Sequence, residues 1–441
     1  MISGVMDAQN GTRSPHTLAL SVMMFLQFFL WGAWFVTLGP FMDTLKMGGS
    51  SGGTWIGNAY STAPIAAIVA PFFLGVVADR FFASQRVMGV LHLVGGLLLL
   101  AAPVVAKQSI ENPLPFVGVL LAHMMCYMPT LGLSNTVAFN CMSNPEKQFP
   151  LIRVWGTIGW IVAGFVVGWL AGVVTNHGSE AARAASPQFF YVGGVSGVVL
   201  GLFCFALPNT PPPMKGKPVD VGAIFGRDAL ALLGDRSYLV FAVCSLLVCI
   251  PLAAYYALAG TYVGAAGFAN VPQTMTYGQM SEIFFMLVMP LLFARLGVKW
   301  MLAVGMLAWA VRYGLFGAAW GAEGAIHSYQ WMIIAGIALH GICYDFFFVT
   351  GQIYTERKAR AEIRGQAQGF LVLITQGVGM LIGAQVIGRL KDHYTTAATE
   401  KGPAVTDWHS FWMAPALFAA AVMVIFVLLF RDKRRAGENP G

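Results

Sequence analysis

Long apolar segments alternate with short polar connections along almost the whole chain. Each apolar segment reaches about 20 residues, the length that an α-helix needs to cross a bilayer, whereas a barrel strand needs only about half of that. We therefore expect an all-α polytopic membrane protein. The pattern predicts twelve transmembrane helices, at about residues 17–42, 54–78, 86–106, 113–142, 151–175, 187–207, 235–263, 272–296, 299–320, 328–356, 362–390 and 408–431.

One connection is longer and more polar than the others, and it begins with the proline-rich segment Leu207-Pro-Asn-Thr-Pro-Pro-Pro213. It predicts an N-terminal six-helix half at 1–207, a cytoplasmic linker at 208–234 and a C-terminal six-helix half at 235–441. Two six-helix halves repeated in parallel are typical of the major facilitator fold, in which the substrate site lies at the midplane between the halves. We expect this fold and a site in this place.

Basic residues are distributed unevenly between the two sides of the predicted membrane. Eighteen Lys and Arg fall on the side of the termini and six on the other side, while Arg153 and Arg312 fall within or at the edge of helices. The positive-inside rule then predicts a multi-pass protein of the bacterial inner membrane with both termini in the cytoplasm. The net charge of +7 follows from this bias and needs no nucleic-acid partner. The polar N-terminus predicts no cleaved signal peptide.

Two carboxylates interrupt the apolar segments of the C-terminal half. Asp345 lies in the run 331–349, near the middle of the helix predicted at 328–356, and Glu282 lies about ten residues into helix 272–296, with Gln279 on the same face. A carboxylate in hydrocarbon costs about 2.5–3.5 kcal/mol on insertion scales. One such group can be structural, but two in one half favour proton coupling. Asp345 precedes three phenylalanines and is the drier site, so we expect it to be the main proton carrier and Glu282 to be partly a ligand contact.

Two arginines also fall within predicted helices. Arg153, Thr157 and Trp160 share one face of helix 151–175 and form a candidate binding face. The alternative for Arg153 is that its side chain snorkels to the cytoplasmic interface. Arg312 has a tryptophan and a tyrosine close by in the sequence, which is typical of an interfacial belt, so we expect a structural role for it.

Other polar and aromatic side chains fall in predicted helices as well. Three roles are open for His340, namely proton relay, substrate contact and packing histidine. Tyr344 shares its helix face, and Tyr255 and Tyr256 follow a kink predicted at Pro251. Gln27, Trp31 and Trp34 form a stripe on the first helix that is a further candidate, although it can also be plain packing. Asn58 and Asn135 are two amides that we expect to be buried.

Motifs of other function classes are missing from the sequence. There is no GxxxxGK[ST] phosphate-binding loop, so transport would have to be driven by a gradient. No HExxH motif or CxxC pair is present, so we expect no enzyme and no cofactor, with protons as the coupling ion. Six cysteines lie in or at the ends of apolar runs and are expected to be small packing residues: Cys126, Cys141, Cys204, Cys244, Cys249 and Cys343.

Several segments together carry a family resemblance that extends through nearly all twelve predicted helices. They are Phe25-Leu-Gln27-Phe-Phe-Leu-Trp31-Gly-Ala-Trp34, Tyr127-Met-Pro129-Thr-Leu-Gly-Leu-Ser-Asn135-Thr, Ile152-Arg153-Val-Trp155-Gly-Thr157-Ile-Gly159, Gln279-Met-Ser-Glu282, Trp309-Ala-Val-Arg312 and Tyr344-Asp345-Phe-Phe. The chain resembles the nucleoside:proton symporters of the major facilitator superfamily. The resemblance implies import of purine and pyrimidine nucleosides with protons from the periplasm. It also implies which residues line the nucleoside site: Arg153, Thr157, Trp160, Gln279, Glu282, His340, Tyr344 and Asp345.

Part of the expected ligand shell departs from the family pattern. His340 stands in place of a tyrosine, Tyr344 and Trp160 in place of phenylalanines, and Ala253 and Tyr256 in place of polar amides. We include Tyr256 among the expected substrate contacts. The substrate therefore stays open between a nucleoside, a nucleobase and a sugar-like metabolite, and a transport-inactive ligand sensor is the alternative from another class. We expect a monomer whose partners are a small-molecule substrate and the lipid bilayer.

Overall fold

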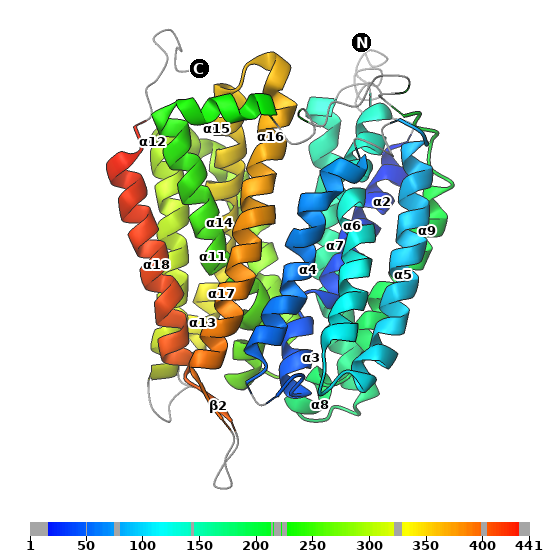
Figure 1. Cartoon of the computed structure of the whole chain (residues 1–441), viewed down its shortest axis with the longest axis vertical. Coiled ribbons are helices and arrows are strands. Elements are labelled where there is room, and N and C mark those ends of the chain that lie inside the picture. The colour runs from blue at the N-terminus through cyan, green and yellow to red at the C-terminus, as the bar shows by residue number, and fades with distance from the viewer. Residues whose placement is uncertain are drawn as a thin grey trace, which may run out of the picture.

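The protein folds into two groups of long helices that lie side by side, and both ends of the chain lie at the same end of the bundle (Figure 1). The computed structural model describes residues 16–49, 51–74, 80–142, 145–212, 215, 222, 227–321, 329–397 and 404–431. Within these ranges, eleven helices are long and apolar enough to cross a membrane. One of them, described below, is long enough for two crossings, so the twelve predicted spans are accounted for.

The N-terminal half keeps the predicted helices with small changes at their ends, except that the helix expected at 17–42 is interrupted at residues 35–37 and forms α2 (Thr17–Trp34) and α3 (Leu38–Thr44). The helix predicted to start at 151 begins earlier, at Pro145, and the predicted end of the second helix, 75–78, lies outside the described residues. The elements are α2 (Thr17–Trp34), α3 (Leu38–Thr44), α4 (Gly53–Phe73), α5 (Ser84–Gln108), α6 (Leu114–Asn140), α7 (Pro145–Val174), α8 (Glu180–Ala184) and α9 (Gln188–Cys204).

The C-terminal half is more broken than its apolar pattern predicts. Its first long helix, α11 (Arg236–Ala265), is capped by Asp235, whose carboxylate accepts hydrogen bonds from the backbone N–H groups of Ser237 and Tyr238. The boundaries of the linker 208–234 stay a prediction. The elements are η2 (Arg227–Gly234), α11 (Arg236–Ala265), α12 (Val271–Gly321), α13 (Gln330–Ala338), α14 (His340–Tyr344), η4 (Asp345–Val349), α15 (Thr350–Lys358), η5 (Ala361–Ile363), α16 (Arg364–Val372), η6 (Leu373–Gly379), α17 (Met380–His393), β1 (Thr395–Thr396), β2 (Val405–Thr406) and α18 (Trp408–Leu429).

α12 supplies two of the predicted spans without a polar loop between them. It runs for 51 residues, and its backbone leaves the helical conformation at Gly297, where φ is 66°. Glycine adopts such a positive φ without the steric penalty of a side chain. At 1.5 Å per residue, α12 is far longer than one crossing of a bilayer about 30 Å thick, so its two arms on either side of Gly297 match helices 272–296 and 299–320.

Two predicted helices contain a wider turn that the sequence pattern does not reveal. The helix expected at 328–356 passes through the π-helical segment η4, and the helix expected at 362–390 passes through the π-helical segment η6. Such insertions are frequent at functional sites. Asp345 is the first residue of η4, so the wide turn begins at the buried carboxylate.

The most extensive packing between the two halves is that of α4 against α17. A Cβ atom at Gly57 would lie 2.5 Å from the carbonyl oxygen of Ala384, and one at Gly388 would lie 2.6 Å from the carbonyl oxygen of Gly53. Real side chains do not tolerate these distances. Glycine at these positions therefore allows the two backbones to touch.

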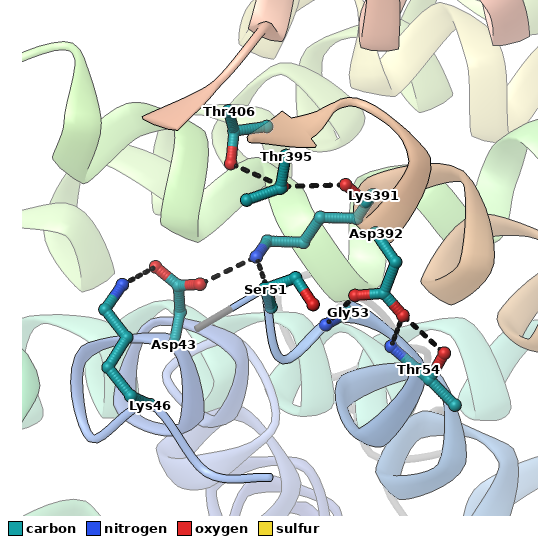
Figure 2. Close-up of polar contacts among 9 residues, drawn as sticks. All are labelled: Asp43, Lys46, Ser51, Gly53, Thr54, Lys391, Asp392, Thr395 and Thr406. Atoms are coloured by element: carbon teal, nitrogen blue, oxygen red, sulfur yellow. Dashed lines mark hydrogen bonds and ion pairs between the residues drawn. The ribbon is translucent and has the colours of Figure 1, made fainter. Parts of the chain in front are cut away.

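Polar contacts join the halves at the end of the bundle away from the termini (Figure 2). The Lys391 ammonium lies 2.8 Å from an Asp43 carboxylate oxygen and also donates to the Ser51 carbonyl oxygen. The Asp392 carboxylate accepts hydrogen bonds of 2.8 Å from the backbone N–H groups of Gly53 and Thr54, at the start of α4. Lys391 is only 1% exposed, although the sequence places it just beyond the helix predicted at 362–390. We call these contacts the seam latch.

Candidate functional site

The expected site residues of the two halves are brought together by the crossing of α7 and α12. Gly164 of α7 lies against Thr276 of α12, and Gly168 lies against Gln273. Because residue numbers rise along α7 as they fall along α12, the helices are antiparallel. The turns of α7 before Gly164, which carry Trp160 and Thr157, therefore lie beside the turns of α12 that carry Gln279 and Glu282. Gln279 is 9% exposed, and Thr157, Trp160 and Glu282 are half-buried.

Charges of opposite sign face each other across this seam. Glu282 and Arg153 interact electrostatically, and Tyr344 lies in the field of both and of Asp345. Arg153 is half-buried, with its guanidinium carbon 4.1 Å from the centre of the Phe28 ring. α7 begins eight residues before Arg153, so this side chain lies about two turns inside the helix and not at its first turn. The binding role of Arg153 stays a prediction.

A series of aromatic rings runs from the N-terminal half to the C-terminal half beside these charges. Neighbouring ring centres are 5.3–6.1 Å apart, within the range of favourable aromatic contacts. The series is Trp160, Trp31, Phe35, Tyr256, Tyr255, His340 and Tyr344. Phe35 was not among the expected site residues, although it lies one turn after Trp31 on the same face. Such rings can stack on a planar ligand.

Asp345 is the most secluded acid of the site. Its side chain is 0% exposed, and neither carboxylate oxygen has a hydrogen-bond partner among the described residues. It interacts electrostatically with Glu282. A buried carboxylate without a partner is costly when ionised and much less so when protonated. The surroundings therefore agree with the expectation that Asp345 is drier than Glu282.

The environment of Arg312 differs from the interfacial belt that its aromatic neighbours in the sequence predict. Its side chain is 0% exposed, and so are those of Trp309 and Tyr313. The three residues thus form part of the core and not an interfacial belt. The Arg312 guanidinium carbon lies 3.3 Å from the centre of the Tyr255 ring, and Nη1 lies 3.4 Å from His340 Nδ1.

The remaining candidates divide between packing and contacts across the halves. Gln27 and Trp34 are 0% exposed, and Gln27 bonds to Thr130 at 2.7 Å, so only Trp31 of the first-helix stripe belongs to the ring series. Asn58 accepts a hydrogen bond of 2.9 Å from Gln385 across the halves. Asn135 is exposed, so the prediction of a buried amide at that position is wrong.

Comparison with known proteins shows to which family the chain belongs. A family model described as nucleoside H+ symporter matches residues 15–435. The chain belongs to the nucleoside H+ symporter family. The resemblance inferred from its segments is thereby confirmed.

Relatives of this symporter family member match it over nearly their full length. YegT of Escherichia coli (strain K12), a candidate nucleoside transporter, is 39% identical over 416 residues, which is 94% of each chain. The nucleoside permease NupG of the same organism is 31% identical over 431 residues, covering 94% of this chain and 96% of NupG. The xanthosine permease of that strain is 29% identical over 432 residues, with the same coverage of 94% and 96%.

Solved structures confirm the predicted major facilitator fold. The crystal structure of the nucleoside transporter NupG superposes with a TM-score of 0.78 at 30% identity, covering 95% of this chain and 100% of that chain. A mutant form of NupG superposes with a TM-score of 0.81 and covers 94% of this chain. A D-xylose–proton symporter shares the fold alone, with a TM-score of 0.69 at 12% identity, covering 92% of this chain and 97% of that chain.

Proposed function

We propose that this protein imports nucleosides together with protons across the bacterial inner membrane by alternating access. The observation that carries the proposal is the placement of two acids of one half, the half-buried Glu282 and the buried Asp345, at a seam where Arg153 of the other half faces them. Charge at this seam can change with protonation, and the seam is also where the halves must move relative to one another. Both termini lie in the cytoplasm in this proposal.

The polar and aromatic groups divide the recognition of a nucleoside between them. The ring series supplies faces on which a base can stack, with Tyr256 and Trp160 on either side of the seam. Arg153, Thr157 and Gln279 supply hydrogen-bond donors and acceptors for the base and the ribose hydroxyls. Glu282 accepts from a hydroxyl while it is ionised, which makes it both a ligand contact and a proton site.

Proton coupling follows from how charge affects the closed site. An ionised Glu282 attracts Arg153, whereas an ionised Asp345 opposes closure because its dry surroundings solvate it poorly. A proton from the periplasm neutralises Asp345 and allows the site to close around substrate. The lower proton concentration of the cytoplasm then favours release of the proton and of the nucleoside. No cofactor, nucleic acid or second subunit is needed for this cycle.

The seam latch fits one state of that cycle. With the termini in the cytoplasm, the latch lies on the periplasmic side. Lys391, Asp43 and Asp392 then hold the periplasmic entrance closed. These contacts have to separate before substrate can enter from outside.

A substrate panel on the purified full chain tests the proposal. Uridine, adenosine, xanthosine, uracil and xylose are compared for binding by calorimetry and for uptake into proteoliposomes. We expect binding and uptake of nucleosides and neither for xylose, because only a nucleoside has both a base to stack and a ribose to hydrogen-bond. Uptake of uracil or xylose without any nucleoside would contradict the proposed substrate class. Nucleoside binding without uptake would indicate the ligand sensor instead.

A further inference from the structure

Arg312 is a buried cation that the proposed transport cycle leaves without a role. It projects from the second arm of α12, is 0% exposed, and has no carboxylate within ion-pair distance in the ranges that the structure describes. A cation in the membrane interior is costly and marks a functional position by default. Its charge is stabilised by the face of Tyr255, 3.3 Å away, and its Nη1 points to His340 Nδ1 at 3.4 Å.

The chemistry of the two partners fixes the direction of this contact. A guanidinium group has only donors, so His340 Nδ1 must be the acceptor. A histidine whose Nδ1 accepts carries its single proton on Nε2, provided that the ring is neutral. The ring cannot easily gain a second proton, because the Nδ1–H would then oppose the Arg312 N–H and two cations would be buried side by side. Arg312 thus selects one tautomer and one charge state of His340.

The other groups around His340 leave this conclusion unchanged. Tyr255 of α11 stacks on the His340 ring, with ring centres 5.3 Å apart and planes 20° apart, and Tyr344 lies 6.0 Å away on the same stretch of chain. Glu282, in the neighbouring arm of α12, and Asp345 are the nearby acids. The charge acting on His340 itself is that of Arg312.

His340 also lies beside the expected ligand-binding residues. A Cβ atom at Gly278 would lie 3.1 Å from the Cβ of His340 and 3.2 Å from the Tyr255 hydroxyl oxygen. Gly278 directly precedes Gln279, so His340 adjoins the part of α12 that faces α7. Among the described residues, the side-chain hydrogen bond of His340 is the one at Nδ1, which leaves Nε2 available as a donor.

We infer that Arg312 is a positioning residue that holds His340 neutral, with Nε2–H presented as a hydrogen-bond donor to the substrate. His340 then contacts the substrate and does not carry the transported proton. The group that it recognises is an acceptor, either a base carbonyl oxygen or a ring nitrogen. The identity of the ligand in this inference rests on the proposed function, whereas the tautomer and charge of the His340 ring do not depend on it.

The state of the ring can be measured without any substrate. The full chain is labelled with 15N-histidine and studied by NMR in lipid between about pH 5.5 and 8, and His340 is assigned by the signal that disappears in His340→Gln. We expect Nε2 to stay protonated and Nδ1 unprotonated over this whole range. In Arg312→Met no donor points at Nδ1, so we expect the neutral His340 ring to populate both tautomers instead of one. A wild-type His340 that is protonated on both nitrogens at pH 5.5, or on Nδ1 alone, would overturn the inference.

Binding of uridine then separates the donor role from simple packing. His340→Gln keeps an N–H donor at a similar reach, whereas His340→Leu removes it. We expect His340→Leu to weaken uridine binding about tenfold relative to His340→Gln, the value of about one neutral hydrogen bond. Equal affinities in folded forms of both variants would contradict the donor role. If the wild type binds no nucleoside while the NMR result is as expected, the proposed function fails and the positioning role of Arg312 stands.

Discussion

At the scale of single residues, the two acids of the C-terminal half have different surroundings. Asp345 is fully buried and has no hydrogen-bond partner among the described residues, whereas Glu282 is half-buried and interacts with Arg153. We therefore expect Asp345→Asn, which imitates the protonated acid, to bind and exchange nucleoside but to lose accumulation against a gradient. Glu282→Gln should lose affinity as well. Calorimetry, counterflow and gradient-driven uptake distinguish the two variants.

The reverse result is easy to recognise. If Asp345→Asn still accumulates nucleoside in response to a proton gradient while Glu282→Gln does not, the two roles are exchanged. The Glu282→Asp variant serves as a control, because it keeps the titrating group and only shortens its reach.

Arg153 should act on the ligand together with Glu282 and not by anchoring the helix. We expect Arg153→Ala to weaken nucleoside binding about 10- to 100-fold, the range of a charge-assisted hydrogen bond. In the double variant with Glu282→Gln, the two losses should not add, because each side chain has already lost its partner. Calorimetry on the four forms measures this coupling. Strict additivity, or normal binding combined with poor membrane insertion, would support the interfacial anchor.

Sequence reasoning identified these residues but not all of their contacts. A carboxylate in an apolar run is conspicuous, so Asp345 and Glu282 could be predicted from the sequence alone. The burial of Arg312 could not, because a tryptophan and a tyrosine near an arginine occur both at interfaces and in cores. Its partner His340 lies 28 residues away on another helix, and no local pattern predicts that pairing.

At the scale of helices, the seam latch depends on one buried lysine. Lys391 is 1% exposed and joins α17 to Asp43, whereas Arg389 on the same helix is exposed and serves as a matched control. We expect Lys391→Met to leave Asp43 without its buried partner and to favour opening of the periplasmic side, because breaking a buried ion pair is strongly destabilising. Arg389→Met should have little effect.

Labelling of a cysteine in the seam measures this opening. Ser61 of α4 is 3% exposed and accepts a hydrogen bond from Gln385 across the halves, so Ser61→Cys reports whether α4 and α17 separate. We expect a membrane-impermeant maleimide, added from the periplasmic side, to react several-fold faster in Lys391→Met than in Arg389→Met. The same rate in both variants would show that the latch does not control the entrance.

Helix positions were well predicted, and interruptions within helices were not. The apolar pattern places most helix ends within a few residues, because both the pattern and the helices are bounded by polar residues. The wide turns η4 and η6 keep the same apolar composition as a regular helix, so hydropathy does not reveal them. The positions of β1 and β2 could not be predicted from hydropathy either, because both strands lie in a polar connection outside the apolar runs.

At the scale of the whole molecule, the structure combines a closed seam on one side with a polar, aromatic site between the halves. Span counting and charge bias predict the six-plus-six division and the common side of both termini. The contacts between halves could not be predicted, since they join residues far apart in the sequence, and Lys391 and Asp43 are 348 positions apart. In the proposed alternating-access cycle, we expect those contacts to stabilise the state in which the periplasmic side is closed.

The most direct test of proton-driven nucleoside import is accumulation in proteoliposomes that contain only the purified full chain. Labelled uridine is supplied outside, and a pH gradient is imposed with the acidic side outside. We predict accumulation above the external concentration, collapse of that accumulation on adding a protonophore, and equilibration without accumulation in Asp345→Asn. Concentrative uptake that continues undiminished after the protonophore would contradict proton symport.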